Sequence, residues 1–430
     1  MKPKIAIVGA GWAGLAAAVE LAPLARVSLF EAGREPGGRA RRVRAEPLTL
    51  DNGQHILLGA YAETLRLMRQ VGVDPDRALL RLPLSWLQPD GIRMRCPRVP
   101  APWHLLLGLI GAEGLSWSDK GRLMRALTRL ALGRWRISAD VTVLEWMKAH
   151  AQSDELLRAF WRPLVLSALN TPIEQASMRI LAAVLRDSLG ARRAASDMLL
   201  PRRDLSALFP DPACAWLARQ GAALHFGRRV QSVRANDGAG VVLDGEVFDA
   251  AIVACAPYHA APLLDDKNLT LAVKSMQFWP IYTVYLCFHS APGLPGVMSG
   301  LKQGTAHWLF DRDALCGEPG LVAAVVSAPD VDALGSHHEL VEGVLDDLRA
   351  LVPLLPEVLW TRVLVDKRAT FAARTGLSRP GIRLGVQSLY LAGDWVDPEY
   401  PATLEGAVRS GVAAARALKQ DLKLKKRQDR

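Results

Sequence analysis

Short apolar runs alternate with helical blocks along this chain. Residues 4–8, KIAIV, are mostly apolar and β-branched, which is typical of a strand buried in a parallel sheet. The Ala- and Leu-rich block 12–21 predicts a helix, and residues 26–30 predict a second strand. Later in the chain the same patterns predict two strands and a helix, at 250–254, 389–392 and 403–418. Strands that alternate with helices in this way indicate an α/β fold with a parallel sheet.

The turn after the first predicted strand carries glycine at three fixed positions. Gly9, Gly11 and Gly14 have the spacing G-x-G-x-x-G. The first permits a tight turn, the second lets the backbone approach a pyrophosphate, and the third lets the helix pack close to the strand. Glu31 can accept hydrogen bonds from a ribose diol and would repel a 2′-phosphate. A purely structural turn is the alternative, but the order of strand, turn, helix, strand and acid favours a site for the ADP part of NAD or FAD.

Further segments favour FAD over NAD. Gly37-Gly38 stands directly before Arg39, which suggests backbone next to a ligand and a guanidinium aimed at a phosphate or a ring carbonyl. Residues 50–61 bring another glycine among polar side chains, and the strand predicted at 389–392 breaks at Gly393-Asp394. An extended FAD needs several separate segments, whereas a nicotinamide does not.

These motifs resemble the FAD-dependent amine oxidase and phytoene desaturase superfamily. The segments 160–177, 185–190, 367–377 and 393–411 resemble more narrowly the squalene-associated FAD-dependent desaturases, also called hydroxysqualene dehydroxylases. The resemblance extends from Lys4 to about Leu418, although residues 396–400 depart from the pattern of that family. It implies FAD as the cofactor and a lipophilic C30 isoprenoid as the substrate.

The glycine turn and the resemblance together give a set of expected cofactor contacts. The resemblance implies that the backbone near Val230 meets the adenine and that residues 50–61 lie near the isoalloxazine. Glu405 is expected to orient the ribityl or pyrophosphate region through its loop. The expected cofactor-binding residues are Gly9, Gly11, Trp12, Ala13, Gly14, Glu31, Gly38, Arg39, Gly53, Gln54, His55, Val230, Gly393, Asp394, Thr403, Leu404 and Glu405.

The predicted domains are interleaved, because the glycine turn and the Gly393-Asp394 segment lie near opposite ends of the chain. We expect a Rossmann-like FAD-binding domain assembled from separated segments, with an interleaved α+β substrate domain. The FAD-binding parts are 1–80, 206–265 and 385–418, the substrate parts are 81–205 and 266–384, and 419–430 is a basic tail. Within the second FAD-binding part, residues 236–238 are expected to make a hairpin turn.

Composition excludes several classes of protein. The net charge is +10, but the arginines are spread along the chain and no nucleic-acid motif is present, so no nucleic-acid partner is expected. The five cysteines have no C-x-x-C spacing, which predicts reduced thiols, no metal site and a cytoplasmic protein. No signal peptide and no apolar run of about 18 residues is found, so no membrane span is predicted.

Two features favour reversible contact with the inner face of an anionic membrane. Residues 98–117 are unusually apolar, and they make either a core helix or a pocket mouth or interfacial anchor. The tail 419–430 has six basic and two acidic residues, and is either a frayed, solvated terminus or an electrostatic membrane contact.

The chemistry implied by the resemblance is hydride transfer between the flavin and a substrate carbon. In the reductive direction an allylic hydroxyl leaves as hydroxysqualene becomes squalene, and an acid would assist it. His55 and Asp51 are the candidate catalytic residues, with a purely structural role as the alternative for each. Tyr282, Thr283, Tyr285 and Trp308 lie in predicted strands that could turn aromatic or polar groups toward a pocket.

Other functions stay open from the sequence. Carotenoid-type desaturation or amine oxidation would use the same scaffold, and a non-catalytic prenyl-binding protein would share the fold. No second dinucleotide-binding turn is found, so the electron donor is unidentified.

Overall fold

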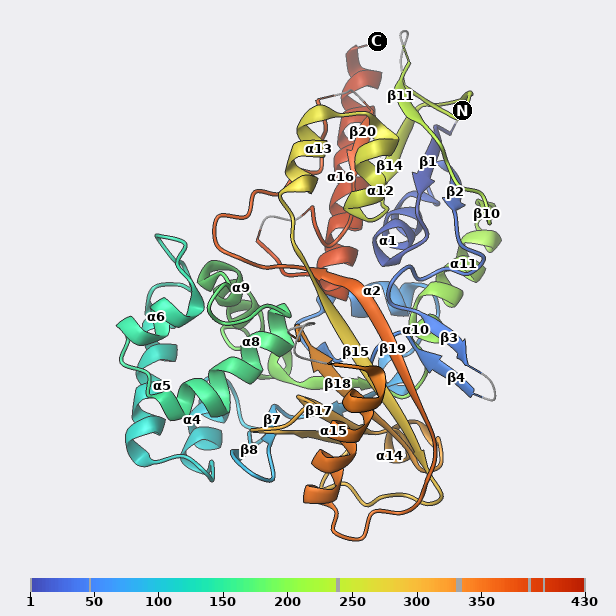
Figure 1. The fold of residues 1–430 in the computed structure, drawn as a ribbon. Helices are drawn as coiled ribbons and strands as arrows, with labels where there is room; N and C mark the ends of the chain where they lie inside the picture. Colours follow the sequence, from blue (N-terminus) through green and yellow to red (C-terminus); the bar gives the residue numbers. More distant parts are fainter. Residues whose placement is uncertain are drawn as a thin grey trace.

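Five parallel strands from distant parts of the chain build the central sheet of the computed structural model (Figure 1). The structure describes residues 2–45, 48–236, 240–329, 335–385, 388–396 and 399–428. The sheet has the order β10-β2-β1-β14-β20. Its strands are β1 (Lys4–Val8), β2 (Arg26–Glu31), β10 (Ala223–Phe226), β14 (Ala250–Val253) and β20 (Leu389–Leu391). The predicted α/β fold, assembled from separated segments, is therefore confirmed.

The central sheet is buried on both faces. Along β1, Ile5 and Ile7 pack into one apolar core, while Ala6 and Val8 pack into another on the opposite face. The first core contains α1 (Trp12–Leu21), α11 (Pro210–Arg219) and α16 (Leu404–Gln428). Because α1 lies between the sheet and two helices, nearly all its side chains are buried, which explains its Ala-rich sequence.

A second, antiparallel sheet forms the lower half of the molecule in Figure 1. Its order is β16-β17-β18-β15-β19, and its strands are β15 (Phe278–Phe288), β16 (Met298–Gly300), β17 (Trp308–Asp311), β18 (Leu321–Ser327) and β19 (Val358–Phe371). Along β15, Val284 and Leu286 pack beneath α15 (His337–Leu351). Tyr285 and Cys287 pack on the opposite face, so β15 separates two apolar layers by its period of two.

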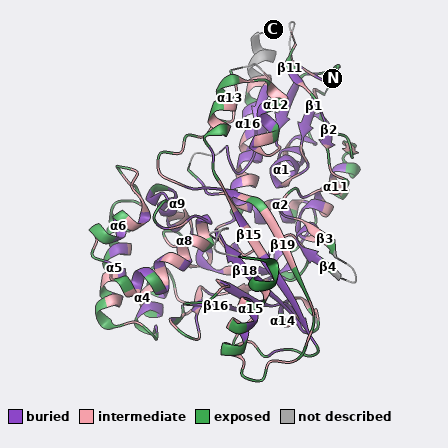
Figure 2. Ribbon diagram, in the orientation of Figure 1, coloured by how far each residue is buried: buried purple, intermediate pink, exposed green. Residues whose placement is uncertain are grey.

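A lobe of helices stands beside the second sheet (Figure 1). It consists of α4 (Trp103–Ile110), α5 (Trp117–Leu132), α6 (Val143–Ala149), α7 (Asp154–Leu156), a π-helical turn (Leu157–Trp161), α8 (Arg162–Leu169) and α9 (Met178–Ser188). Trp161 at its centre is fully buried and packs in the same core as Leu109 of α4 and Val165 of α8. Figure 2 shows that the outer sides of α4, α5 and α6 carry many exposed residues.

Smaller elements complete the fold. The strands are β3 (Arg42–Ala45), β4 (Leu48–Asp51), β5 (Leu57–Leu58), β6 (Leu79–Leu82), β7 (Ser85–Leu87), β8 (Arg93–Arg95), β9 (Met198–Pro201), β11 (Val233–Ala235), β12 (Val241–Leu243) and β13 (Glu246–Phe248). The helices are α2 (Ala62–Gln70), α3 (Pro75–Ala78), a 3₁₀ turn (Arg193–Ser196), α10 (Leu205–Leu208), α12 (Pro257–Leu264), α13 (Lys267–Lys274) and α14 (Arg312–Cys316).

Some sequence expectations fall on residues that the structure does not describe. The expected hairpin turn includes residues 237–238, the unusual stretch 396–400 includes 397–398, and the tail ends at 429–430, all outside the described residues. The predicted domain limits remain predictions. Among the described residues, no helix is both long enough and apolar enough to cross a bilayer. The five cysteines form no disulfide.

Candidate active site

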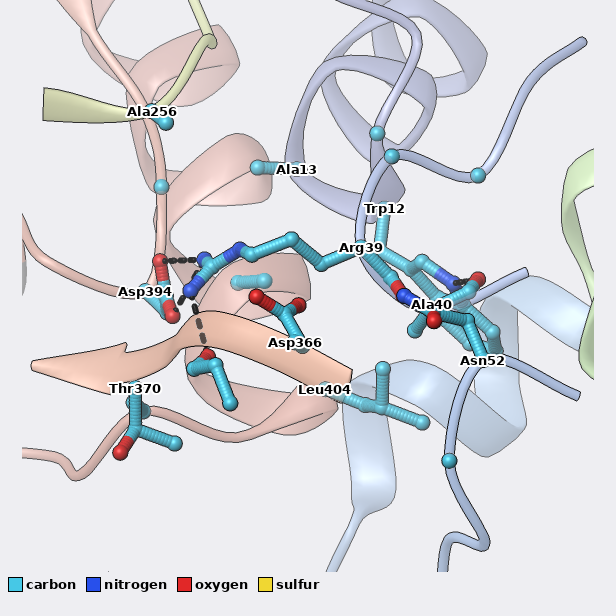
Figure 3. Close-up of a pocket in the computed structure, with 18 of the residues that line it drawn as sticks. Trp12, Ala13, Arg39, Ala40, Asn52, Ala256, Asp366, Thr370, Asp394 and Leu404 are labelled. Atoms are coloured by element: carbon cyan, nitrogen blue, oxygen red, sulfur yellow. Dashed lines mark hydrogen bonds and ion pairs between the residues drawn. The ribbon is translucent and has the colours of Figure 1, made fainter. Parts of the chain in front are cut away.

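A cavity of about 780 Å³ joins the central sheet, the second sheet and the helical lobe. Part of its wall is drawn in Figure 3. Every residue of the expected cofactor-binding set except Gly14 and Glu405 lines this cavity. Segments that are hundreds of residues apart in sequence therefore meet around one space, and their contacts with a cofactor remain predictions.

The glycine turn forms one end of the cavity, and its three glycines have different constraints. Gly9 has φ +106°, and a Cβ there would lie 2.8 Å from the carbonyl oxygen of Ala254. A Cβ on Gly14 would lie 1.9 Å from the oxygen of Gly9. At Gly11 the nearest atom to an added Cβ is 4.0 Å away, on Gly38. Gly9 and Gly14 are thus required by the fold, whereas the space beside Gly11 is open for a ligand.

Glu31 fixes the loops around the same end. Its carboxylate accepts hydrogen bonds from the backbone N–H of Ala10 at 2.8 Å and of Gly33 at 2.7 Å. Both Glu31 and Val230 line the cavity, where the adenosine part of the cofactor is expected. The carboxylate retains lone pairs for a ribose diol, because an ionised carboxylate can accept about four hydrogen bonds.

Arg39 links three segments at the middle of the cavity (Figure 3). Its Nη2 donates to both carboxylate oxygens of Asp394, at 2.6 and 2.7 Å, and its Nη1 donates to the carbonyl of Ala369 at 2.7 Å. Burial alone would lower the pKa of Arg39, but the carboxylate of Asp394 raises it above its ordinary value. The guanidinium therefore stays charged, and the sequence expectation of an arginine beside a ligand is compatible with its position.

His55 lies at the other end of the cavity, next to the second sheet. Its Nδ1 is 2.9 Å from the carbonyl oxygen of Gly53, and because a carbonyl only accepts, we place the ring proton on Nδ1. Burial lowers the pKa of His55 below its ordinary value. The ring is thus neutral near pH 7, and its Nε2 is a hydrogen-bond acceptor.

Asp51, the second candidate catalytic residue, lies behind the cavity wall. Its side chain is buried outside the cavity lining, where it accepts from the N–H of Leu205 at 2.7 Å and lies 3.5 Å from Nη1 of Arg312. Burial raises the pKa of Asp51 to about 7 despite that arginine. Since Arg312 also donates to Gln54 at 2.9 Å, Asp51 belongs to a buried network that positions the cavity wall, and a catalytic role for it stays a prediction.

Glu405 anchors the start of α16 to a neighbouring helix. Its carboxylate accepts from the N–H groups of Glu63 and Thr64, at 3.2 and 3.0 Å, and from the hydroxyl of Thr64 at 2.7 Å. These donors belong to the first turn of α2, so Glu405 joins the start of α16 to the N-terminus of α2. It does not line the cavity, and the expectation that it orients the cofactor through its loop stays a prediction.

Asp366 is an ionisable cavity residue that the sequence interpretation missed. Asp366 of β19 lines the cavity, and its carboxylate lies beside Arg39 in Figure 3. Its charge raises the pKa of His55 and of Arg39, partly offsetting the effect of burial. A single aspartate in a strand has no motif spacing, and only the pairing of Asp366 with Ile281 on β15 reveals its place.

Apolar residues dominate the wall nearest the helical lobe and the second sheet. Thr283 and Trp308 line the cavity as expected, but Tyr282 and Tyr285 do not. The indole of Trp308 donates to the hydroxyl of Ser167 at 2.7 Å and thereby holds α8 against β17. The other apolar lining residues here are Ile56, Leu166, Leu169, Ile281, Phe310, Val325 and Leu364.

The residues present fit an extended FAD. A helix N-terminus with an open glycine suits a pyrophosphate, Glu31 suits a ribose, and the buried region around His55 suits a flat ring. Among the described residues, no group of three His, Cys, Asp or Glu side chains could hold a metal ion.

Comparison with known proteins agrees with this geometry. The model of the flavin containing amine oxidoreductase family matches residues 12–419. The chain belongs to this family. It is an FAD-dependent oxidoreductase, as the glycine turn and the resemblance predicted.

Relatives of this family member include three curated hydroxysqualene dehydroxylases. Those of Rhodopseudomonas palustris and Zymomonas mobilis are 29% and 26% identical, over 96% and 95% of this chain and 98% and 97% of theirs. A probable zeta-carotene desaturase of Synechococcus elongatus is 22% identical over 96% of this chain and 98% of its own.

Solved structures share the fold. A putative protoporphyrinogen oxidase from Exiguobacterium has a TM-score of 0.72 at 18% identity, covering 98% of this chain and 99% of its own. Cyclohexylamine oxidase from Brevibacterium oxydans has a TM-score of 0.71 at 17% identity, covering 98% and 100%. At these identities the likeness concerns the fold alone.

Proposed function

We propose that this oxidoreductase reduces hydroxysqualene to squalene, as a step of squalene and hopanoid synthesis. The observation that carries the proposal is the similarity to hydroxysqualene dehydroxylases over nearly the full length of both chains. The apolar wall around Leu166, Ile281 and Phe310 supports it, because a C30 isoprenoid presents almost only hydrocarbon surface.

The reaction exchanges a hydroxyl for a hydrogen at an allylic carbon. FAD, when bound and reduced, supplies the hydride. The C–O bond breaks, the hydroxyl leaves with one proton as water, and the allylic carbon takes the hydride. The protein must therefore exclude bulk water, deliver one proton and stabilise positive charge on the carbon.

We assign the proton transfer to His55 and the charge stabilisation to Asp366. A lowered pKa makes the protonated imidazole of His55 rarer but a stronger acid, so Nε2 passes a proton readily to a departing hydroxyl. The carboxylate of Asp366 shares the cavity and stabilises positive charge on His55 and on the substrate. The turnover rate is then expected to fall as pH rises, and this slope should be lost in His55→Gln.

Desaturation is the second candidate, supported by the zeta-carotene desaturase relatives. Both reactions would use the same cavity, since each moves a hydride between FAD and an allylic carbon. The direction of electron flow separates them: dehydroxylation consumes electrons, whereas desaturation and amine oxidation release them. Membership of the flavin-containing family argues against a non-catalytic prenyl-binding protein.

The test uses purified protein reduced with dithionite in D₂O and given hydroxysqualene. Squalene with one deuterium at the former carbinol carbon is expected. Hydroxysqualene left unchanged, with polyenes formed from squalene under oxidising conditions, would instead assign desaturation. Gly11→Val serves as the FAD-free control, and Asp366→Asn should retain FAD while turnover slows.

We also propose a cytoplasmic location with reversible contact with an anionic membrane, and a separate electron donor. The donor is needed because the proposed reaction consumes two electrons in each cycle. A screen of reduced ferredoxins and flavin reductases for turnover without dithionite would test this part.

A further inference from the structure

Helix α4 has an apolar face on the outside of the molecule. Its sequence, WHLLLGLI, contains no charged residue. His104, Gly108 and Leu109 are buried against the lobe, whereas Trp103, Leu107 and Ile110 are 59, 47 and 46% exposed. The exposed residues stand at i, i+4 and i+7, so they form one stripe along the helix.

The neighbouring helix extends this stripe. Trp117, at the start of α5, is 72% exposed. Lys120 joins the two helices, because its ammonium lies 4.5 Å from the centre of the Trp117 ring and donates to the carbonyl of Ile110 at 2.7 Å. We call Trp103, Leu107, Ile110 and Trp117 the α4–α5 face. Exposed large apolar residues elsewhere, such as Leu24, Leu271 and Leu354, lie on separate elements and are ordinary surface.

Basic residues surround the α4–α5 face. Residues 93–136 contain nine arginines and lysines but two acids, Glu113 and Asp119. The exposed ones include Arg95 and Arg98 beside the start of α4 and Arg125 and Arg129 on α5. Tryptophans within a basic surround suit the boundary between lipid headgroups and acyl chains.

We propose that the α4–α5 face docks on an anionic bilayer, with Trp103 and Trp117 in the headgroup region. The charge decides the occupant: a second copy packed on this face would bring two basic surrounds together, whereas anionic headgroups neutralise them. Behind the face, Leu109 shares a core with α8, and α8 lines the cavity through Leu166 and Leu169. Docking therefore brings the lobe that walls the cavity against the lipid phase.

This assignment separates two features that the sequence alone grouped together. Helix α16, which leads into the basic tail, rises at the end of the molecule opposite to α4 and α5 (Figure 1). The proposed docking surface is therefore limited to the α4–α5 face.

Vesicle flotation without substrate tests the proposal independently of the reaction. Wild-type protein is expected to float with phosphatidylglycerol–phosphatidylcholine vesicles at low salt and to float less at high salt. Trp103→Ser/Trp117→Ser should lower the bound-to-free ratio by roughly tenfold or more, because two interfacial aromatic anchors are lost. Arg125→Glu/Arg129→Glu should lower binding to the anionic vesicles in the same direction.

Matched controls keep the result specific. Leu271→Ser/Leu354→Ser removes two exposed apolar side chains elsewhere and should float like the wild type. The flavin spectrum and turnover of detergent-dispersed hydroxysqualene report whether each variant is folded, so a failure of docking is distinguished from a failure of the proposed reaction.

Three results would overturn the proposal. One is unchanged flotation of Trp103→Ser/Trp117→Ser, and another is loss of flotation on removal of residues 423–430 alone, which would assign the contact to the tail. The third is a wild-type dimer that ignores vesicles and becomes monomeric in the tryptophan variant, which would assign the face to a second copy.

Discussion

Arg39 and Asp394 form a two-point ion pair although 355 residues separate them in sequence. The pair ties the turn after β2 to the turn after β20, and the bond from Arg39 to Ala369 adds β19. The cavity wall is thus held where the central sheet meets the second sheet. Loss of the contacts that Arg39 makes between these segments should therefore weaken cofactor binding.

Arg39→Lys should weaken FAD binding by roughly tenfold or more, because the single nitrogen of lysine cannot reproduce the separate bonds of Nη1 to Ala369 and of Nη2 to Asp394. Equilibrium dialysis of FAD measures this. Arg383→Lys is the matched control, since Arg383 makes a similar pair with Asp421, at 3.1 Å, away from the cavity. Equal FAD affinities in the two variants would contradict the role of Arg39.

A substitution at Gly11 should impair cofactor binding, whereas a substitution at Gly14 should impair folding. Gly11→Ala should keep the thermal stability of the FAD-free protein but weaken FAD binding, because its Cβ meets open space that a ligand would fill. Gly14→Ala should destabilise the protein itself, since its Cβ collides with Gly9. Gly121→Ala, in open space on α5, should alter neither property. Normal FAD affinity in Gly11→Ala would count against the site.

Asp51 should make stability depend on pH. Its pKa is raised from 3.8 to about 7 in the folded protein, so the folded state binds the proton more tightly than the unfolded state. Its contribution to stability is full below about pH 4 and is lost as pH rises toward 7. In Asp51→Asn the free energy of unfolding, measured with urea across this range, should decline less with pH. Parallel curves for the two proteins would show that Asp51 is ionised in both states.

Glu405→Ala should lower the free energy of unfolding by about 2 kcal/mol, because a buried carboxylate loses three hydrogen bonds at the start of α2. Thermal and urea unfolding measure the change. Glu342→Ala, on the exposed side of α15, is the control. If Glu405→Ala instead released FAD without loss of stability, the expected role of Glu405 toward the cofactor would be supported and the structural role contradicted.

The docking surface gives the membrane proposal a defined geometry. Trp103 and Trp117 lie on the lobe that walls the cavity, and α16 ends on the far side of the molecule. The basic tail and the apolar stretch looked like one membrane signal when only their composition was considered. The vesicle variants described above test the two separately.

Local spacing was sufficient to predict the glycine turn, Glu31, the strands around them and the α/β class. These features depend on contacts within one strand–turn–helix unit, where the allowed backbone conformations of neighbouring residues permit few other structures. The resemblance added FAD, and the family match agrees with it.

Packing decided the rest. Asp51 and His55 are near neighbours in sequence, yet His55 lines the cavity and Asp51 lies in the network of Arg312. Asp366 reaches the cavity because β19 pairs with β15, and Glu405 lies at α2 because α16 packs beside it. The direction of each side chain depends on which distant segment packs against it. The packing of distant segments is determined by burial of apolar surface across the whole chain, and not by the neighbouring residues in sequence.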